Sequence, residues 1–349
     1  MKLNFNKTLL YVIPALIGLS ANAQKEAPQK TPGINVPFMD KSVKPSEDFF
    51  KFVNGTWLKN TEIPADKTRW GSFDELRQNT DKDALAILKE ASKNPKYKSN
   101  TDQGKAIIMY KAAMDTVARN KQGITPLAPY LAKINAVKNA ADLQALLIQM
   151  APQGGLGFFG VGIGVDAKNS NRNVINVGPG SVGLPDRDYY VSEDADSKEK
   201  RAKYVLHLTK MLQLIGEKPA EAQANADKIL AFETTMSKPR FDRVERRDRR
   251  KSYNPMTVND LQKLTPSINW DSYLSQIGLP KTDSLIVSQP KYLIALETIL
   301  KENKVDDWKA YMRWTLLNKS ASQLSTQLEK ANWEFYGKTL TGAVKQRPL

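Results

Sequence analysis

Apolar residues recur at helical spacing over most of this chain. After Ser46, the residues Phe49 and Phe52 fall on one face of a helix, for which Ser46 is the expected N-cap. The dipeptide Asn54-Gly55 is expected to stop or bend this helix. The same periodicity predicts further helices near residues 72–92, 102–119, 127–136, 140–150, 192–215, 220–237, 290–303 and 305–336.

Two neighbouring segments depart from the helical period. The stretches LGFFGVGIGVD (156–166) and NRNVINVGPG (171–180) alternate or run apolar with glycine, and a polar turn joins them. This pattern predicts a β-hairpin, and SLIVSQ (284–289) predicts one further short strand. The expected fold is therefore mainly α, a multi-helical lobe with a small β-hairpin insertion. We expect one domain over residues 38–349, because no internal boundary is evident after residue 40.

The first residues have the pattern of a secretory signal peptide. Two lysines precede the apolar run Thr8–Leu19, and small residues follow up to Ala23. The run is shorter than the roughly 20 apolar residues that span a bilayer, which disfavours an uncleaved membrane anchor. We expect a signal peptide over residues 1–23 and a flexible, Pro-rich leader over residues 24–37. The mature protein is then periplasmic or secreted, and membrane association through an uncleaved segment is the alternative.

The net charge of +15 raises the question of a nucleic-acid partner. Most lysines are spread along the helical stretches, where a solvated face explains them. The densest cluster, FDRVERRDRRK (241–251), interleaves arginines with acids three residues apart, which predicts ion pairs along a helix. No nucleic-acid-binding motif is present, so nucleic acid is not an expected partner. The chain has no cysteine, so its stability must come from burial and not from disulfides.

The residues by themselves supply no self-sufficient active site. The one histidine, His207, has apolar neighbours in KYVLHLTKML, which favours a packed helix face over a catalytic role. A zinc site needs several nitrogen, sulfur or oxygen ligands in a tight cluster, and the sequence contains no H-E-x-x-H motif. It also contains no G-x-S-x-G nucleophile elbow, and no G-K-[ST] closes the glycine run at 154–164 as it would in a phosphate loop.

The stretch TRWGSFDELRQN (68–79) concentrates charged and aromatic residues. Ser72 and Glu75 form the S-x-x-E pattern of a capping box, with Ser72 as the N-cap. Asp74 and Arg77 stand three residues apart, which predicts an ion pair on the helix surface. The residues alone favour the start of a helix, and a site that holds part of a substrate is the alternative.

Several segments together resemble one protein family. The stretch DFFKFVNGTWLKNTEIPADKTRWGSFDELRQN (48–79) closely resembles the N-terminal region of the neprilysin and endothelin-converting-enzyme family of zinc metallopeptidases. Further segments match that family in order and spacing: GLPDRDYYV (183–191), YNPMTVNDLQKLTPSINWDSYL (253–274), VSQPKYL (287–293), Tyr311–Leu317 and FYGKTLTGAVKQRP (335–348). The resemblance covers nearly the whole chain after the leader, and it is to the cysteine-free bacterial type.

The family implies a two-lobed secreted or membrane-anchored peptidase. One lobe carries zinc at an H-E-x-x-H motif with a further glutamate, and the other is a helical cap that encloses the substrate chamber. In the family the zinc motif comes after the point at which this sequence stops. The chain therefore resembles the N-terminal cap, incomplete at its C-terminal end. This implies zinc in the full-length enzyme, and neither bound metal nor a catalytic residue in this chain.

The resemblance also implies a substrate site in this chain. Arg69 matches an arginine that binds the C-terminal carboxylate of the substrate, and Asp74 and Arg77 match an acid and a second arginine beside it. A guanidinium suits this role because it offers two parallel N–H donors to a carboxylate. The expected partners are peptides and the family's catalytic lobe. The alternative function is a non-catalytic, exported peptide-binding module.

The helix after Ser46 carries a further expectation from the resemblance. Its face with Phe49, Phe52 and Trp57 would normally be covered by the catalytic lobe. In this chain we expect that face to be an exposed apolar patch.

Overall fold

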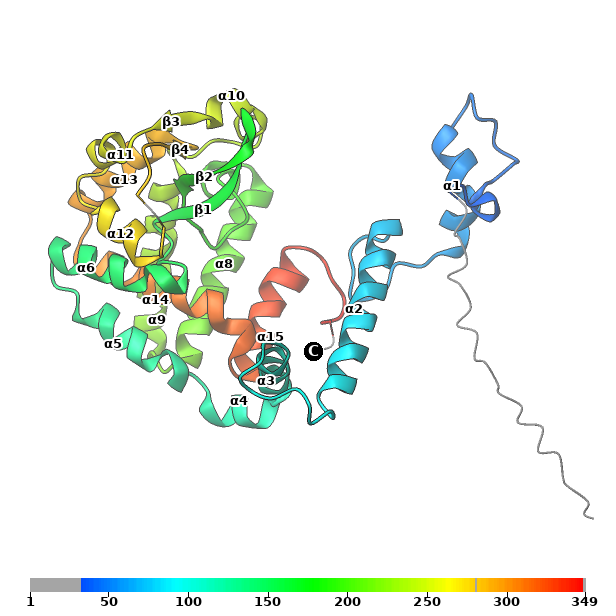
Figure 1. Cartoon of the computed structure of the whole chain (residues 1–349), viewed down its shortest axis with the longest axis horizontal. Coiled ribbons are helices and arrows are strands. Elements are labelled where there is room, and N and C mark those ends of the chain that lie inside the picture. Colours follow the sequence, from blue (N-terminus) through cyan, green and yellow to red (C-terminus); the bar gives the residue numbers. More distant parts are fainter. Residues whose placement is uncertain (1–32, 280, 348–349) are drawn as a thin grey trace, which may run out of the picture. The chain divides into compact units, whose positions relative to one another are not determined.

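The computed structural model describes residues 33–279 and 281–347. The predicted signal peptide and most of the predicted leader lie outside these residues. The chain falls into two compact units, Met1–Glu62 and Ile63–Leu349, and each is described by itself. Helices make up most of the second unit, which also contains a small sheet (Figure 1), so the predicted fold class is confirmed. The predicted domain limits, residues 38 and 349, remain predictions.

The first unit contains a short 3-10 turn, Val36–Phe38, and helix α1, Phe49–Asn60. The prediction of Ser46 as the N-cap is wrong: Asp48 caps α1, and its side chain accepts from the backbone N–H of Lys51 at 2.9 Å. Ser46 lies too far before the first helical residue to reach the exposed N–H groups.

The dipeptide Asn54-Gly55 does not stop α1. Gly55 is buried, and a Cβ atom there would lie 2.6 Å from the Cβ of Asp40. Gly55 therefore allows α1 to lie close to the segment that contains Asp40. Phe49 is 67% exposed, as expected for the apolar face, whereas Trp57 is half-buried and its ring lies 6.4 Å from that of Phe38.

The second unit contains the remaining helices, and most predicted helices are present. Their bounds are α2 Ser72–Ala91, α3 Asp102–Met114, α4 Thr116–Gln122, α5 Ala128–Ala136, α6 Ala140–Met150, α7 Asp188–Val191, α8 Ala195–Leu214, α9 Pro219–Ser237, α10 Arg249–Ser252, α11 Val258–Leu264, α12 Trp270–Gln276, α13 Pro290–Glu302, α14 Val305–Ser320 and α15 Thr326–Trp333. A π-helical turn, Glu334–Thr339, follows α15.

Two long predicted helices are each divided by a capping side chain. The stretch 102–119 breaks at Asp115, whose carboxylate accepts from the N–H of Ala118 at 2.9 Å and starts α4. The stretch 305–336 breaks before Ser325, which caps α15. Aspartate and serine compete for backbone N–H groups in this way, so they favour a new helix start over continuation.

The basic cluster at 241–251 is not one helix, contrary to the prediction. It forms a 3-10 turn, Glu245–Arg247, followed by α10. Asp242 accepts from the backbone N–H groups of Val244 and Glu245 at 2.8 and 2.7 Å, and its carboxylate thereby shapes a turn.

The sheet has four strands in the order β1-β2-β4-β3. Strands β1, Phe159–Asp166, and β2, Asn169–Pro179, pair antiparallel and confirm the predicted hairpin. Strand β4, Leu285–Val287, also confirms a prediction and runs parallel to β2. Strand β3, Asn254–Met256, was not predicted, because three residues with a central Pro255 carry no strand pattern.

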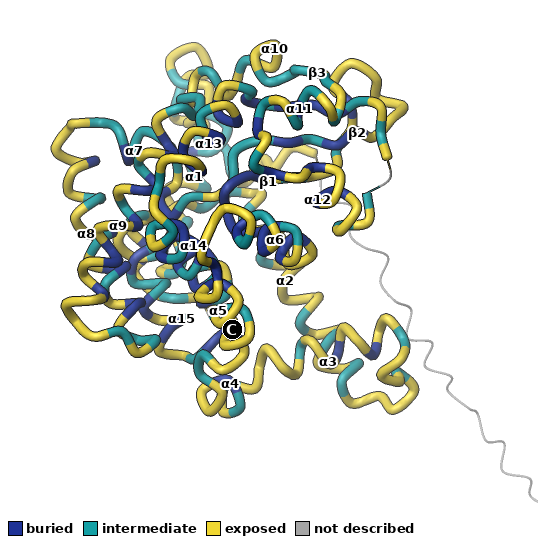
Figure 2. The backbone as a smooth tube through the Cα atoms, turned by 90° about the vertical axis from the view of Figure 1, so that its left-hand side faces the viewer, coloured by how far each residue is buried: buried dark blue, intermediate teal, exposed yellow. Residues whose placement is uncertain are grey.

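The core of the second unit consists of two hydrophobic clusters. The first surrounds the sheet and includes Phe158 and Trp270, and the second lies between α8, α9, α14 and α15 and includes Tyr204 and Trp314. Helix α14 contributes residues to both clusters. Figure 2 shows buried segments in dark blue along α14, whereas α2 is drawn mainly in yellow. No helix in the described ranges is long and apolar enough to cross a membrane.

His207 lies in the second cluster, as predicted for a packed histidine. It is 5% exposed, and its ring stacks on Phe335 with 4.7 Å between centroids and an interplanar angle of 8°. Its Nε2 has no hydrogen-bond partner among the described residues. Burial lowers the pKa of His207 to about 3, so the ring is neutral.

Candidate substrate-binding segment

The segment that precedes α2 is a turn followed by extended backbone. The N–H of Lys67 donates to the carbonyl of Pro64 at 2.8 Å, and Gly71 is extended with φ −170° and ψ 177°. Gly71 is the N-cap of α2, and its carbonyl accepts from the N–H groups of Asp74 and Glu75 at 3.0 Å each. The predicted Ser72 capping box is wrong, because Ser72 is already the first helical residue and no side chain caps α2.

The three predicted substrate-binding residues lie at this helix start. Arg69 and Arg77 are exposed, and Asp74 is half-buried in the first turn of α2. The predicted ion pair between Asp74 and Arg77 is not formed. Among the described residues, no carboxylate lies within ion-pair distance of Arg69 or Arg77. The structure thus places the three residues on one short segment without joining them to one another.

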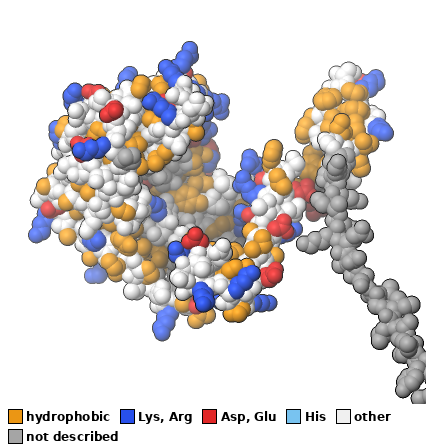
Figure 3. All heavy atoms as spheres, in the orientation of Figure 1, with side chains coloured by type: hydrophobic (Ala, Val, Ile, Leu, Met, Phe, Trp, Pro, Cys, Tyr) orange, Lys and Arg blue, Asp and Glu red, His pale blue; other side chains and the backbone are white. Residues whose placement is uncertain are grey.

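Helix α2 has an unusually exposed surface for its length. It has no buried residue, and Phe73, Leu76 and Ile87 are 85%, 62% and 65% exposed. These positions share one helix face. Figure 3 shows hydrophobic side chains at the surface of this part of the chain, among charged ones. Exposed apolar side chains grouped on one face are typical of surfaces that interact with another protein or lobe.

The last described residues hold the turn in place. The N–H groups of Val344 and Lys345 both donate to the carbonyl of Ala65, at 3.1 and 3.0 Å. Arg347 lies 3.7 Å from the carboxylate of Asp66 and 3.4 Å from that of Asp81 on α2. Sequence reasoning missed this contact, because no local pattern indicates pairing between segments so far apart in the chain.

A second polar site missed from the sequence is the buried Glu233 of α9. Glu233 is 1% exposed, and its carboxylate accepts from the N–H of Gly183 at 3.0 Å and from the hydroxyls of Tyr190 and Tyr204 at 2.7 and 2.9 Å. Burial raises the pKa of Glu233 to about 7, against the three hydrogen bonds and the charge of Arg240. A glutamate in a helical pattern gives no sequence signal of such burial.

The described residues do not fit a zinc ion. Within residues 33–279 and 281–347, no three side chains of His, Cys, Asp or Glu come together as a metal-binding group. His207 is enclosed by aromatic rings and does not face a carboxylate cluster.

Several known proteins are similar to this chain in sequence. Endothelin-converting enzyme 1 of Cavia porcellus is 29% identical over 310 residues, which cover 85% of this chain and 40% of the relative. Neprilysin-3 of Drosophila melanogaster is 28% identical over 314 residues, covering 84% of this chain and 40% of that protein. The chain thus spans about 40% of the length of the curated relatives that it matches.

Solved structures show the same fold. The crystal structure of the zinc metalloprotease Zmp1 of Mycobacterium tuberculosis with an inhibitor has a TM-score of 0.81 at 31% identity, over 90% of this chain and 48% of that chain. PepO from Lactobacillus rhamnosis HN001 has a TM-score of 0.74 at 19% identity, over 88% of this chain and 48% of that chain, which supports the fold alone. Residues 45–349 match the model of Peptidase family M13. This chain therefore belongs to peptidase family M13 and corresponds to the N-terminal part of that family.

Proposed function

We propose that this chain is the substrate-enclosing N-terminal part of a zinc metalloendopeptidase, and that residues 68–79 bind the C-terminal carboxylate of peptides. In this proposal Arg69 binds the carboxylate, and Asp74 and Arg77 position it. The names of the relatives support the reaction class, since they include a converting enzyme and a zinc metalloprotease. The chain is inactive by itself, and zinc and the general base belong to the catalytic lobe of the family.

The proposal rests on the exposure of Arg69 and Arg77 and on their lack of ion pairs among the described residues. Both guanidinium groups are exposed, and no described carboxylate lies within ion-pair distance of either of them. Asp74 lies in the first turn of α2 and pairs with neither arginine. A peptide carboxylate would supply the two acceptors that suit a guanidinium fork. The N-terminal end of α2 adds a favourable field for an anion.

The apolar face of α2 supports a second part of the proposal. We propose that Phe73, Leu76 and Ile87 pack against the catalytic lobe, the partner that the family implies. The relatives are more than twice as long as the part that this chain matches, which leaves room for such a lobe. Burial of three large apolar side chains at such an interface would contribute several kcal/mol, at about 25 cal/mol per Å² of apolar area.

A pair of peptides tests the carboxylate site. We expect the full chain to bind a short peptide with a free C-terminal carboxylate more tightly than the same peptide as its C-terminal amide, by calorimetry. Arg69→Gln should abolish the difference between the two peptides. Arg250→Gln is the matched control, because Arg250 is exposed and lies outside the segment. Equal binding of acid and amide by the unaltered chain would refute the site.

Zinc content and hydrolysis test the remaining claims. We expect no stoichiometric zinc by elemental analysis and no cleavage of either peptide. Stoichiometric zinc together with hydrolysis would overturn the claim that the chain is inactive alone. Peptide binding that is unaffected by the Asp74→Asn and Arg77→Gln substitutions would remove their positioning role and leave Arg69 alone in the site.

We also propose that the protein is exported. The basic start, apolar run and small residues up to Ala23 support cleavage at that point. Expression in a bacterial host followed by mass spectrometry of the mature protein tests this. A mature N-terminus at Gln24 is expected, and an intact Met1 in a protein retained in the cytoplasm would contradict it.

A further inference from the structure

A cavity of about 450 Å³ lies between the loop 179–187 and the segment 240–246 of the second unit. Its lining contains three arginines, Arg187, Arg240 and Arg246. These residues come from two segments on either side of α9, so the fold brings them together. None of them belongs to the proposed substrate segment at 68–79.

The guanidinium of Arg240 is fixed but incompletely bonded. Its Nε donates to the carbonyl of Met236 at 3.1 Å, its Nη1 donates to that of Gly180 at 2.8 Å, and its Cζ lies 5.1 Å from the centre of the Tyr292 ring. Its Nη2 is buried and has no hydrogen-bond partner among the described residues. A buried charged donor without an acceptor is costly, so an acceptor in the cavity would be favourable.

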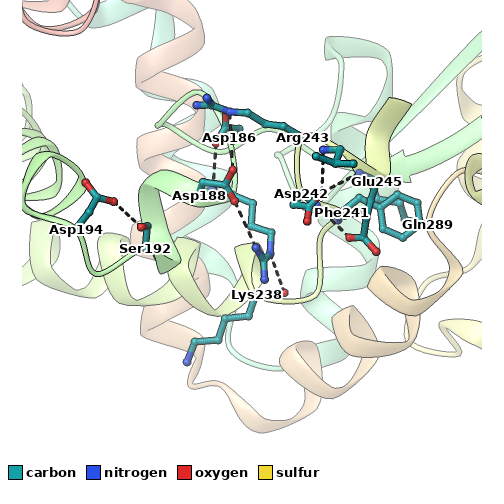
Figure 4. A network of polar contacts seen from close by, with 12 residues as sticks. Asp186, Asp188, Ser192, Asp194, Lys238, Phe241, Asp242, Arg243, Glu245 and Gln289 are labelled. Atoms are coloured by element: carbon teal, nitrogen blue, oxygen red, sulfur yellow. Dashed lines mark hydrogen bonds and ion pairs between the residues drawn. The ribbon is translucent and has the colours of Figure 1, made fainter. Parts of the chain in front are cut away.

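The one acidic residue in the lining is already paired. Asp186 accepts from Nε of Arg243 at 2.7 Å and from the backbone N–H of Asp188 at 3.0 Å. Figure 4 shows Arg243 reaching over Asp186 and Asp188 from the neighbouring segment. The carboxylate of Asp186 therefore does not offset the arginines of the cavity.

The positive charge of the cavity has little other compensation. Arg246 is exposed, and no carboxylate in the described ranges lies within ion-pair distance of Arg240 or Arg246. Arg187 is the partial exception, because it contacts Asp188 at 3.4 Å and its charge contributes to the lowered pKa of Asp242. Glu233 lies behind Gly183, and burial raises its pKa to about 7, so its carboxyl is partly neutral at neutral pH. Charge alone therefore favours an anion here.

Gln289 adds a neutral donor to the lining. Its Oε1 accepts from the backbone N–H of Phe241 at 2.8 Å, a contact drawn in Figure 4. This bond fixes the amide and leaves its Nε2 as a donor in a side chain that also lines the cavity. The three guanidinium groups and an amide N–H of the lining match the several lone pairs of a carboxylate.

We propose that this cavity binds the side-chain carboxylate of an acidic residue in a peptide. The proposal extends the proposed peptide-binding function to a second position on the chain, away from Arg69. It gives the protein a preference for peptides that carry Asp or Glu, in addition to recognition of the C-terminal carboxylate. The cavity volume is within the range of small-ligand sites, roughly 300–1,000 Å³, and holds one acidic side chain with its neighbours.

Blocked peptides separate this site from the one at Arg69. A pentapeptide with a central Glu, acetylated and amidated, has no terminal carboxylate, and its Gln counterpart differs only in charge. In calorimetry with the full chain, we expect the Glu peptide to bind about tenfold more tightly, as for one charge-assisted hydrogen bond. Arg246→Gln should abolish this preference, and Arg187→Gln should reduce it. Thermal melting confirms that both variants are folded.

Arg247→Gln and Arg69→Gln are the controls. Arg247 is exposed beside Arg246 but does not line the cavity, so its variant should keep the preference for Glu. Arg69→Gln should also keep this preference. The result can therefore be interpreted even if Arg69 does not bind a peptide carboxylate. Equal binding of the two peptides, or a preference that survives Arg246→Gln, would overturn the proposal. Binding of inorganic phosphate in place of the Glu peptide, without any Glu preference, would likewise assign the cavity to free anions and refute a peptide site.

Discussion

The backbone N–H of Gly183 donates to the carboxylate of Glu233, 3.0 Å away, and this bond fastens the loop 179–187 to helix α9. Two tyrosine hydroxyls complete the coordination of the same carboxylate. The loop supplies much of the lining of the cavity that contains Arg187, Arg240 and Arg246, here called the arginine cavity. Glu233 thus positions the loop that lines this cavity, although Glu233 is not itself a lining residue.

Gly183→Ala should destabilise the protein. A Cβ atom at this position would clash with the hydroxyl of Tyr204, which is fully buried and bonded to Glu233. We expect a loss of about 1–3 kcal/mol in the free energy of unfolding, measured with urea. Gly162→Ala is the control, because Gly162 is exposed on β1 with no atom within 4 Å of the added Cβ. Equal stability of the two variants would refute the close fit.

Glu233→Gln should change how stability depends on pH. The pKa of Glu233 rises from 4.5 to about 7 on folding, so the folded state holds its proton while the unfolded state releases it. This glutamate therefore lowers the free energy of unfolding as pH rises between those values, by up to about 3 kcal/mol. Urea titrations from about pH 4.5 to 8 should show that the variant lacks this loss. Parallel curves for both proteins would contradict the raised pKa.

His207→Phe should show the opposite sign. The pKa of His207 falls from 6.5 to about 3, so the unfolded state binds a proton below about pH 6.5 and the folded state does not. The stability that the neutral ring contributes is present above that pH and is lost as pH falls. By about pH 5 the loss is roughly 2 kcal/mol, and the variant should lack it. A titration of the ring near its ordinary pKa in NMR spectra would contradict the buried, neutral state.

Arg119→Lys should also be destabilising. Arg119 is 9% exposed, and its guanidinium donates to the carbonyls of Leu324 and Ser322 at 3.0 and 2.9 Å and to Glu329 at 2.9 Å. A lysine keeps the charge opposite Glu329 but cannot reach these acceptors together, so we expect a loss of about 1–3 kcal/mol. The matched control is Arg249→Lys, because Arg249 is exposed. Thermal and urea unfolding both measure the difference.

Periodicity predicted the helices because most of them bury one apolar face. It failed where side chains interrupt the backbone: Asp115 and Ser325 start new helices, and Asp242 shapes a turn within the basic cluster. These residues act through single hydrogen bonds that a window of hydrophobicity does not register. The hairpin was predictable because its two strands are adjacent, whereas three-residue β3 depends on pairing with a distant strand.

The candidate site was predictable only in part. The resemblance indicated Arg69, Asp74 and Arg77, of which the two arginines are exposed and Asp74 is half-buried, and their substrate-binding role stays a prediction. The predicted N-cap of α2 was wrong, because Gly71 and not Ser72 takes the N-cap position. The arginine cavity could not be predicted, because Arg187 and Arg240 meet through tertiary packing and no spacing in the sequence records that meeting.

The hydrogen bonds from Val344 and Lys345 to Ala65 bear on the order of folding during synthesis. A ribosome adds about 5–20 residues per second, so the turn before α2 leaves it well before its partners are made. Until then Phe73, Leu76 and Ile87 of α2 are exposed, and the hydrogen bonds that hold the turn before α2 have not formed. The nascent chain therefore carries an exposed, unanchored helix with a partly apolar face for many seconds, which makes α2 a natural contact for chaperones during synthesis.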